Sequence, residues 1–579
     1  MQFSLIEKVF SILPAGNKRE LYKLGVLQII GMGLEVLGIG LLIPIFSIMS
    51  SSMLTSHSHF LRSAIQFLGS PSPNTFLVYY MIFVAFFYFL KSFFFGNLIW
   101  RQNKIATDLH QYVSTKLFYG YLNQPYYFHL NVNSSKLIST IQTEVAQLSN
   151  VFLAFLFIMV EIGVIISIIC FLIWQDPLIT IMVFCFFLLM SWSYQKLSKK
   201  RLLFWGLKRQ NLSYKIHQNL QETFVGIKDI LLYEKKKWFF NIFKNEISDY
   251  TGTTARINTA NAFPRFFLEL IVILMLTFLV SFMVWMNKSN NEILSILMLF
   301  SAAAFRTIPS FSKILSSLQT IRYSSPVVDS IHNEFKSIDN NTASADFGYS
   351  DTNASPINFK TSIRITDLSF KHVGTDNETL KNINLSIIKG QSIGIIGESG
   401  SGKTTLVDLL LGLHLPTKGL IEVDDVNIFR IMENWRGAIG YVPQFIFLTD
   451  DTIRRNIAFG LPDVEIDNER IAQIIKEVNL VKLIESIPQG YDTIVGEQGV
   501  RLSGGQRQRL GIARALYRDP DILIFDEATS ALDIETEEAI MNEIHKYQSL
   551  KTLIFITHRL SSLVNCDNVY RIESGKILV

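Results

Sequence analysis

The stretch "GESGSGKTT", residues 397–405, decides the fold of the second part of this 579-residue chain. It fits the pattern G-x-x-x-x-G-K-[ST], follows the apolar run "SIGII" and precedes the helical sequence "LVDLLLGL". A strand, a glycine-rich loop and a helix in this order form a phosphate-binding loop, whose backbone N–H groups surround phosphate oxygens. We expect Lys403 to reach the β- and γ-phosphates of a nucleotide, and Thr404 to offer its hydroxyl to Mg²⁺. The residues expected to hold the nucleotide here are Gly397, Glu398, Ser399, Gly400, Ser401, Gly402, Lys403, Thr404 and Thr405.

The composition before residue 335 is that of a membrane protein. The whole chain is 49% hydrophobic and only 18% charged, with a mean hydropathy of +0.29, whereas about a quarter of the residues of a soluble protein are charged. A membrane-spanning helix needs about 20 mostly apolar residues. About six runs fit this length, namely 22–49, 76–100, 151–174, 178–194, 266–285 and 293–314.

Lysine and arginine in the loops predict the orientation, because cytoplasmic loops carry an excess of both. The segments 101–144 and 196–256 are rich in these cations and the other loops are poor. We therefore expect both chain ends and both long loops in the cytoplasm, with the spanning helices continuing beyond the membrane. The first outer loop contains "HFLRSAIQFLG", whose apolar residues fall on one face of a helix. This helix either packs on the spans or lies on the outer leaflet.

The remaining composition excludes several classes of protein. A net charge of +4 gives no indication of a nucleic-acid partner. Cys170, Cys185 and Cys566 have neither the spacing of metal ligands nor that of a disulfide framework. The first apolar run is too long for the hydrophobic part of a signal peptide, so we expect no cleaved signal.

The sequence after the apolar part predicts a linker and an α/β domain. Residues 336–360 are rich in Asn, Ser and Asp and have no apolar period, which is typical of a linker. "SIRITDLSF", "INLSII" and "QSIGIIG" then have the composition of strands, and helices and strands alternate after them. The predicted fold is an α-helical transmembrane domain (1–335), a linker (336–360) and an α/β P-loop ATPase domain (361–579).

A second motif, "ILIFDEATSALD", begins at Ile522. Its apolar residues predict a buried strand that ends at Asp526, a candidate ligand for Mg²⁺. Glu527 follows and is placed to act as the general base for an attacking water. Alone, a strand that ends in Asp-Glu is more often a surface pair than a catalytic one. Its weight comes from the phosphate loop upstream and from "LSGGQRQRL" between the two.

Together these motifs resemble the ATP-binding cassette family over roughly residues 360–579. The resemblance rests on the phosphate loop, "LSGGQ" (502–506), "FDEATSALD", Gln444 in "YVPQ" and His558 in "ITHRL". It implies that the "LSGGQ" of one cassette closes on the ATP held by another, and it assigns Gln444 to Mg²⁺ and His558 to the γ-phosphate. A loop of small residues that opens a helix suits such a contact, because it offers N–H groups and a positive dipole end. The residues that the family would place against the second nucleotide are Ser503, Gly504, Gly505, Gln506 and Asp533.

One position departs from the family pattern. Where the family usually stacks adenine on a tyrosine, "LSFKHVG" has His372. Imidazole can also stack, so ATP binding with altered strength is expected. The alternative is that His372 faces solvent and another residue stacks on the base.

One cassette after about six spans resembles a half-transporter of the exporter type, which implies a homodimer in the bacterial inner membrane. The stretches beginning at Tyr121 and Glu222 resemble the two cytoplasmic loops whose short helices touch the cassettes. A regulator that binds ATP without pumping is the alternative from another class. Intact Lys403, Ser503, Glu527 and His558 argue against it, because a regulator has no need of hydrolysis.

Charged residues inside the predicted spans bear on the substrate. At 1.5 Å per helical residue, Glu35, Lys91 and Arg306 lie roughly 20 Å below the outer surface, and Arg265 with Glu269 lies deeper. Glu161 is a further acid in these spans. Intramembrane charges usually face a cavity or a partner. Either these acids and bases pair and hold the helices, or Lys91, Arg265 and Arg306 receive a phosphate or pyrophosphate head group, with Glu35 orienting one of the cations.

The membrane segments also resemble the flippases of this family that serve bacterial protein N-glycosylation. The resemblance rests on "FPRFFLE", "FRTIPS", the glutamate of the first span and the amphipathic outer helix. It implies a polyprenyl-pyrophosphate-linked oligosaccharide as substrate. These motifs are short, and another lipid, a peptide or a drug stays open.

Overall fold

The computed structural model describes residues 2–41, 73–175, 177–286, 290–344, 359–528, 534–559 and 563–578. The chain divides into two compact units. The first comprises residues 1–124 and 131–340, and the second comprises residues 125–130 and 341–579.

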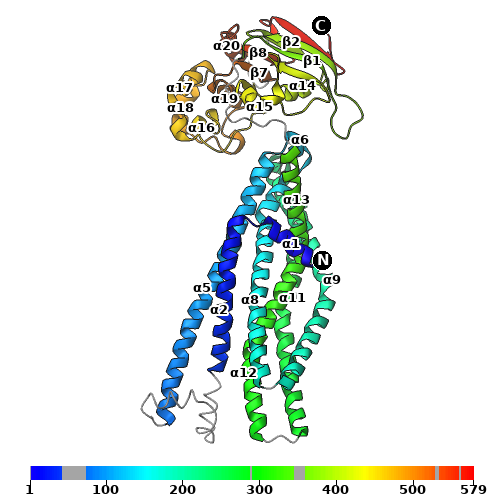
Figure 1. The fold of residues 1–579 in the computed structure, drawn as a ribbon. Helices are drawn as coiled ribbons and strands as arrows, with labels where there is room; N and C mark the ends of the chain where they lie inside the picture. Colours follow the sequence, from blue (N-terminus) through cyan, green and yellow to red (C-terminus); the bar gives the residue numbers. More distant parts are fainter. Residues whose placement is uncertain are drawn as a thin grey trace. The chain divides into compact units, whose positions relative to one another are not determined.

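The first unit is built from long helices that lie side by side (Figure 1). The three longest, α5, α9 and α11, have 50, 49 and 50 residues. At 1.5 Å per residue each is about 75 Å long, more than twice the thickness of a hydrocarbon core of about 30 Å. The helices therefore extend well past any membrane, as predicted. Their bounds are α1 (Gln2–Ile12), α2 (Ala15–Gly40), α5 (Pro73–Leu122), α7 (Ser134–Ser139), the π-helical turn η1 (Thr140–Glu144), α8 (Val145–Gln175), α9 (Pro177–Val225), α10 (Ile227–Leu232), α11 (Lys236–Trp285), α12 (Asn290–Tyr323) and α13 (Ser325–Ser344).

The outward faces of these helices are apolar. On α5, the side chains of Phe83, Phe86, Phe89 and Phe93 are between 53% and 74% exposed. A continuous aromatic face of this kind would aggregate in water and is the normal surface of a helix in lipid. The backbone of such a helix satisfies its own hydrogen bonds, which is the second requirement for crossing a bilayer.

The described helices can be compared with the six predicted spans. Within the described ranges, four helices are long and apolar enough to cross a membrane, and a fifth qualifies if the pair Thr180–Tyr194 and Ser198–Val225, bent by 43°, counts as one span. The sixth predicted span lies in α12, which is not among them.

Two predicted connections can be compared with the structure. Helix α13 continues to Ser344, so the first nine residues of the predicted linker are helical. Short helices occur in both predicted cytoplasmic contact loops, α6 (Tyr126–Asn131) in the first and α10 in the second. The amphipathic outer segment, residues 59–69, and the rest of the linker up to residue 358 lie outside the described residues.

The second unit is an α/β domain with two sheets. The antiparallel sheet has the order β2-β1-β4-β5, and the larger sheet has the order β10-β9-β3-β8-β7-β6. In the larger sheet β9, β3, β8, β7 and β6 run parallel. The strands are β1 (Ser362–Phe370), β2 (Leu380–Ile388), β3 (Ser392–Ile396), β4 (Lys418–Val423), β5 (Val426–Asn427), β6 (Ile439–Val442), β7 (Ile522–Asp526), β8 (Thr552–Ile556), β9 (Asn568–Glu573) and β10 (Lys576–Leu578).

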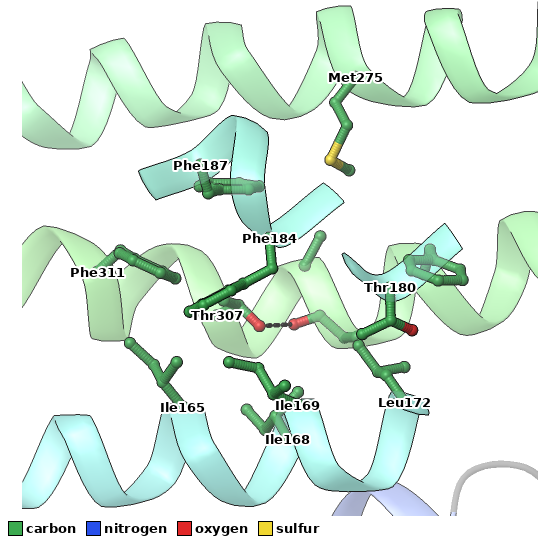
Figure 2. Close-up of a pocket in the computed structure, with 13 residues that line it drawn as sticks. Ile165, Ile168, Ile169, Leu172, Thr180, Phe184, Phe187, Met275, Thr307 and Phe311 are labelled. Carbon is green, nitrogen blue, oxygen red and sulfur yellow. Dashed lines mark hydrogen bonds between the residues drawn. The ribbon is translucent and has the colours of Figure 1, made fainter. Parts of the chain in front are cut away.

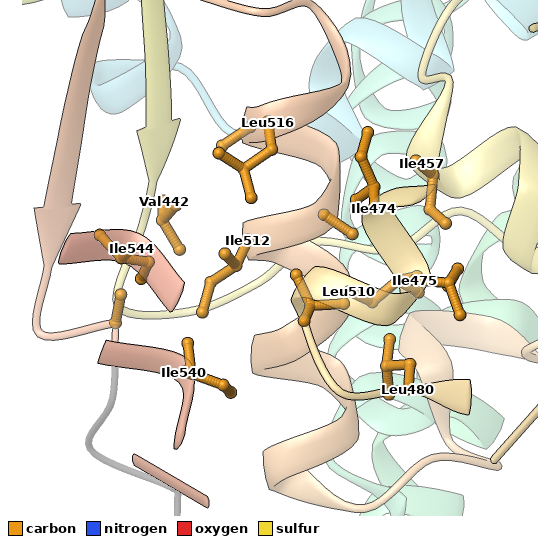
Figure 3. Packing of buried hydrophobic residues seen from close by; sticks show 14 of the residues in the cluster. Val442, Ile457, Ile474, Ile475, Leu480, Leu510, Ile512, Leu516, Ile540 and Ile544 are labelled. Atoms are coloured by element: carbon orange, nitrogen blue, oxygen red, sulfur yellow. The ribbon is translucent and has the colours of Figure 1, made fainter. Parts of the chain in front are cut away.

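Helices cover this sheet and bury a continuous core. Strands β7 and β8 are buried at every residue, as expected for central parallel strands with both faces covered. One core cluster joins these strands to the helices on one side, through residues such as Leu510, Ile512 and Ile540 (Figure 3). The helices of this unit, besides α6, are α14 (Lys403–Leu410), α15 (Met432–Gly437), α16 (Ile453–Ile457), α17 (Asn468–Glu477), α18 (Val481–Ser486), α19 (Gly504–Tyr517) and α20 (Ile534–His545), with single 3₁₀ turns at Ile428–Arg430, Asp463–Glu465, Gly490–Asp492 and Glu497–Gly499.

Candidate functional site

The predicted nucleotide residues meet at one edge of the larger sheet. Strands β3, β8, β7 and β6 are consecutive neighbours and parallel, so their carboxyl ends lie together. Open α/β sheets bind ligands at this edge. The phosphate loop follows β3, His558 follows β8, and Glu527 follows β7 directly. Gln444 comes two residues after β6.

The phosphate loop folds around the ammonium group of Lys403. Gly400 and Gly402 have φ angles of 81° and 111°, in the left-handed region that favours glycine. Gly402 directly precedes helix α14. Lys403 Nζ donates to the carbonyl oxygens of Gly397 at 2.7 Å and Glu398 at 2.8 Å. Burial lowers the pKa of Lys403, and the carboxylates of Glu527 and Asp526 oppose that shift.

Asp526 has the surroundings of a ligand for a hard cation. It is 7% exposed, and among the described residues its carboxylate receives one hydrogen bond, from the Tyr441 hydroxyl at 3.3 Å. Burial raises the pKa of Asp526, the Tyr441 bond opposes this, and the charge of Glu527 adds to it. A buried carboxylate with so little compensation favours a divalent cation, and oxygen donors suit Mg²⁺. Thr404 is exposed and is the second residue of α14, directly after the phosphate loop.

Glu527 is held from both sides by the other two predicted catalytic residues. Gln444 Nε2 donates to Glu527 Oε2 at 2.6 Å, and His558 Nε2 lies 3.1 Å from Glu527 Oε1. The backbone of Glu527 has a φ of 48°, and its N–H donates to the carbonyl of Ile556 at 2.8 Å. Each carboxylate oxygen has a further lone pair for a water. The structure therefore brings Glu527, Gln444 and His558 together around one proton acceptor.

The "LSGGQ" segment forms the start of helix α19. Ser503 caps this helix: its Oγ accepts from the N–H of Gln506 at 3.2 Å, and its own N–H donates to Gln506 Oε1 at 2.8 Å. This reciprocal capping box uses the side chain of Gln506 within its own chain. Gly504 and Gly505 are the first two helical residues, where N–H groups and the positive dipole end face outward. Asp533 lies outside the described residues.

His372 belongs to a cluster of rings. Its half-buried imidazole lies edge-on to Phe370, with centroids 4.8 Å apart, and to His414 at 5.8 Å. His414 also contacts Phe370 and, at 5.7 Å, Tyr126 of α6. Burial lowers the pKa of His414, and the neighbouring His372 lowers it further. His372 is therefore backed by aromatic rings rather than surrounded by solvent.

Asp408, one turn into α14, is a source of pH-dependent stability. Burial, and after it the charge of Asp526, raises the pKa of Asp408 to about 6, from 3.8. Its pKa is thus higher in the folded chain than in the unfolded chain. Such an acid loses folded-state stability as the pH rises from its unfolded pKa to its folded pKa.

We expect Asp408→Asn to raise the free energy of unfolding of the nucleotide-free cassette by about 2 kcal/mol at pH 7.5, and by roughly half as much at pH 5. Urea unfolding at both pH values measures this, with Asp376→Asn, at a fully exposed side chain, as the control. An equal gain at both pH values would exclude ionisation of Asp408 as the cause.

The charges in the membrane unit fall into two groups. Glu35 is 2% exposed and binds two cations: Lys91 Nζ lies 2.8 Å from its Oε2, and Arg306 Nη2 lies 2.7 Å from its Oε1. Glu35 therefore contacts two cations, whereas the sequence analysis expected it to orient one. Arg265 is separate and pairs with Glu269 at 3.0 Å, the i,i+4 pair that the spacing permits. Its side chain is 70% exposed.

A small cavity lies between helices α8, α9, α11 and α12 (Figure 2). Its volume is about 40 Å³, and its walls are almost entirely apolar, with Ile168, Phe187 and Phe311 among them. Thr307 lines it as well, but its hydroxyl donates to the carbonyl of Ala303 at 2.6 Å. This cavity offers no group for an anionic head.

Sequence reasoning missed four residues of these sites. Tyr441 bonds Asp526, the charge of Asp526 acts on Asp408, His414 lies edge-on to His372, and Tyr88 lies beside Lys91. Tyr441 stands in "YVPQ", of which the sequence analysis singled out Gln444 alone. The other three belong to no motif. The signal for Asp408 was a carboxylate within the mostly apolar sequence "LVDLLLGL".

Two family profiles match the chain. That of the ABC transporter matches residues 380–530, and that of the ABC transporter transmembrane region matches residues 41–308. Together the matches cover more than half of the sequence and both units. The chain belongs to the ABC transporter family. Its fold, a helical transmembrane domain of the exporter type followed by an α/β cassette, is that of the bacterial Atm1-family ABC exporter with ATP bound, with a TM-score of 0.79 over 97% of this chain and 94% of that one, at 21% identity.

Relatives of this ABC transporter match it over little more than a third of its length. The heterocyst differentiation ATP-binding protein HepA of a Nostoc species is 44% identical over 221 residues, which are 38% of this chain and 36% of that protein. The ATP-dependent lipid A-core flippase of Chromohalobacter salexigens is 41% identical over 217 residues, 37% of either chain. The leukotoxin translocation ATP-binding protein LktB of Mannheimia glucosida is 44% identical over 217 residues, 37% of this chain and 30% of that protein. The match thus spans between 30% and 37% of the length of these relatives.

Proposed function

We propose that this ABC transporter hydrolyses ATP and uses the reaction to move a lipid with an anionic head from the cytoplasmic to the outer face of the bacterial inner membrane. One observation carries the ATPase part. Glu527, at the end of a buried strand beside the phosphate loop, is held between Gln444 and His558. This is the arrangement of an oriented general base.

In this proposal each residue has a defined task in hydrolysis. The backbone of the phosphate loop and Lys403 bind the phosphates, and the ammonium exchanges its carbonyl partners for phosphate oxygens. Glu527 takes the proton of the attacking water at one of its oxygens, while Gln444 and His558 hold its orientation. His558 then lies next to the γ-phosphate. His372 provides a ring for adenine.

The donor set fits Mg²⁺, which such ATPases use to neutralise phosphate charge. Asp526 would hold the ion through its buried carboxylate and Thr404 through its hydroxyl, and Gln444 would add an amide oxygen. The bond from Gln444 to Glu527 uses the amide nitrogen, Nε2, and not the amide oxygen.

A homodimer completes the site. The chain has one phosphate loop and one "LSGGQ" segment. The capped start of α19 presents Ser503, Gly504 and Gly505 as outward donors, a ready site for a phosphate group. A second copy would supply these donors to the first nucleotide, with Asp533 at the same junction. Both termini and the cassettes would then lie in the cytoplasm.

Clustered cations support an anionic substrate. Lys91 and Arg306 meet at the carboxylate of Glu35, so two cations lie together in the membrane unit. Arg265 is a third cation; it pairs with Glu269, and its side chain is 70% exposed. Arginine binds phosphate in a bidentate way, so a polyprenyl-pyrophosphate-linked oligosaccharide is the substrate we favour. Flippases for lipid A-core among the relatives make a lipid cargo plausible for this chain.

A protein or peptide cargo is the second candidate, because toxin translocation proteins are also among the relatives. ATPase stimulation in proteoliposomes separates the candidates. We expect a polyprenyl-pyrophosphate glycan to stimulate hydrolysis severalfold, lipid A to stimulate it less, and cationic drugs not at all. Stimulation by drugs or peptides alone would overturn the lipid proposal, and no hydrolysis under any condition would favour a regulator.

A further inference from the structure

Both carboxylate oxygens of Glu35 accept hydrogen bonds from cations inside the membrane unit. Oε2 accepts from Lys91 at 2.8 Å and Oε1 from Arg306 at 2.7 Å, so helices α2, α5 and α12 meet at one carboxylate. The side chains of Glu35, Lys91 and Arg306 are 3%, 11% and 29% exposed. A carboxylate bonded to two cations in this way occupies the positions that two oxygens of a phosphate group would take.

Helix α2 is shaped to admit the ammonium group. Gly31, Glu35 and Gly38 lie on one buried stripe, with Gln28 one turn before it. A Cβ atom on Gly38 would lie 3.0 Å from Lys91 Nζ, so a side chain here would push the ammonium away from Glu35. Tyr88 closes the other side: its hydroxyl donates to the carbonyl of Gly38 at 3.1 Å, and its ring centroid is 4.9 Å from Lys91 Nζ.

A second carboxylate, Glu161 of α8, lies near this group. Its charge acts on the guanidinium of Arg306. Its Oε2 atom is buried and has no hydrogen-bond partner among the described residues. With Glu161 counted, the two cations and two carboxylates are balanced. A balanced group avoids the cost of isolated charges in the membrane.

We propose that Glu35 is a built-in counter-ion: it occupies the anion site formed by Lys91 and Arg306 until the phosphate head of the substrate displaces it, and its return to the cations promotes release. The inference rests on the proposed function, whose substrate site it deepens. Glu35 touches no substrate in this scheme and is a positioning residue. Glu161 keeps Arg306 partly neutralised while the exchange takes place.

The proposal predicts that two kinetic constants fall together. Glu35→Gln keeps the volume and one acceptor oxygen but removes the competing charge. The lipid head should then bind more tightly and leave more slowly, so the KM and the kcat of lipid-stimulated hydrolysis both fall. A purely structural role would lower kcat or stability without lowering KM.

Binding to the full-length protein in nanodiscs tests this directly. The probes are inorganic pyrophosphate and undecaprenyl pyrophosphate, with a non-hydrolysable ATP analogue saturating the cassettes because the phosphate loop also binds pyrophosphate. We expect both probes to bind Glu35→Gln roughly tenfold more tightly than the wild type. Tighter binding of undecaprenyl pyrophosphate alone would support a lipid head as the only ligand. Glu20→Gln, on the same helix and paired with Lys23 at 2.6 Å, should change nothing.

A second, conservative variant keeps the proposal testable if Glu35→Gln is unstable. The shorter carboxylate of Glu35→Asp cannot reach both cations, so affinity for the two probes should lie between those of the wild type and Glu35→Gln. Equal or weaker binding by both variants would overturn the counter-ion role. Tighter probe binding in a protein that flips no pyrophosphate-linked glycan would overturn the proposed substrate and keep the counter-ion role.

Discussion

Glu527→Gln should stop ATP turnover while ATP stays bound. The carboxamide keeps the size of the side chain and can still bond Gln444 and His558, but it cannot accept the proton of the attacking water. Loss of a general base lowers turnover by roughly 10²- to 10⁴-fold. The phosphate loop, Lys403 and Asp526 are untouched, so nucleotide affinity should persist.

The measurements use the purified, reconstituted protein. Phosphate release measures turnover, and retained radiolabelled ATP measures nucleotide binding. Glu543→Gln is a matched control, because it neutralises a surface carboxylate that pairs with Lys546 far from the phosphate loop in sequence. Full hydrolysis in Glu527→Gln would remove this residue as the base. Loss of ATP binding would show instead that its charge is needed for the site to form.

Neutralising Arg265 and Arg306 together should abolish most lipid transport and leave basal hydrolysis within about twofold. Each hydrogen bond to a charged group contributes roughly 1.5–3 kcal/mol, so the double variant Arg265→Gln/Arg306→Gln should lose at least about 100-fold in transport efficiency. Glu35 keeps Lys91 as a partner in this variant, and Glu269 is half exposed. Glu35 therefore keeps a cation, whereas Glu161 loses the charge of Arg306.

Flipping of a fluorescent polyprenyl-pyrophosphate glycan in proteoliposomes is the measurement, with hydrolysis followed in parallel. Arg101→Gln is the control, since Arg101 is an exposed arginine of α5 that bonds Asn97 at 2.9 Å and lies just outside a predicted span. Unchanged flipping in the double variant would assign Arg265 and Arg306 to the pairing of helices alone. The paired state of both arginines in the structure makes this a real alternative.

The cassette was predictable because its chemistry lies in short, contiguous motifs. The strand, loop and helix around Lys403 occur as the local pattern requires, with β3 and α14 on either side. The strand 362–370 was predicted residue by residue. Ser503 and Gln506 have the spacing of a capping box. The structure shows that the side chain of Gln506 is used in this box.

The membrane unit was less predictable, because hydropathy indicates apolar length and carries no information about packing. Helix α12 shows the difference. It packs against α8, α9 and α11, and hydropathy does not predict these neighbours. Helix α13 likewise continues to Ser344, past the start of the linker that composition predicted.

The sequence by itself determined which groups carry the chemistry: a phosphate loop, an Asp-Glu pair at a strand end, and a balanced set of acids and bases in apolar helices. Only the tertiary structure decided which of them meet. Parallel neighbours in the sheet bring the ends of β6, β7 and β8 together, so Gln444 and His558 reach Glu527 across 83 and 31 positions of sequence. Packing of α2 against α5, with Arg306 of α12 at the same point, gives Glu35 both of its cations and leaves Arg265 with Glu269. The physical reason is the same in both cases: a residue's type is local, whereas the partner of a buried charge is set by the packing of elements distant in sequence.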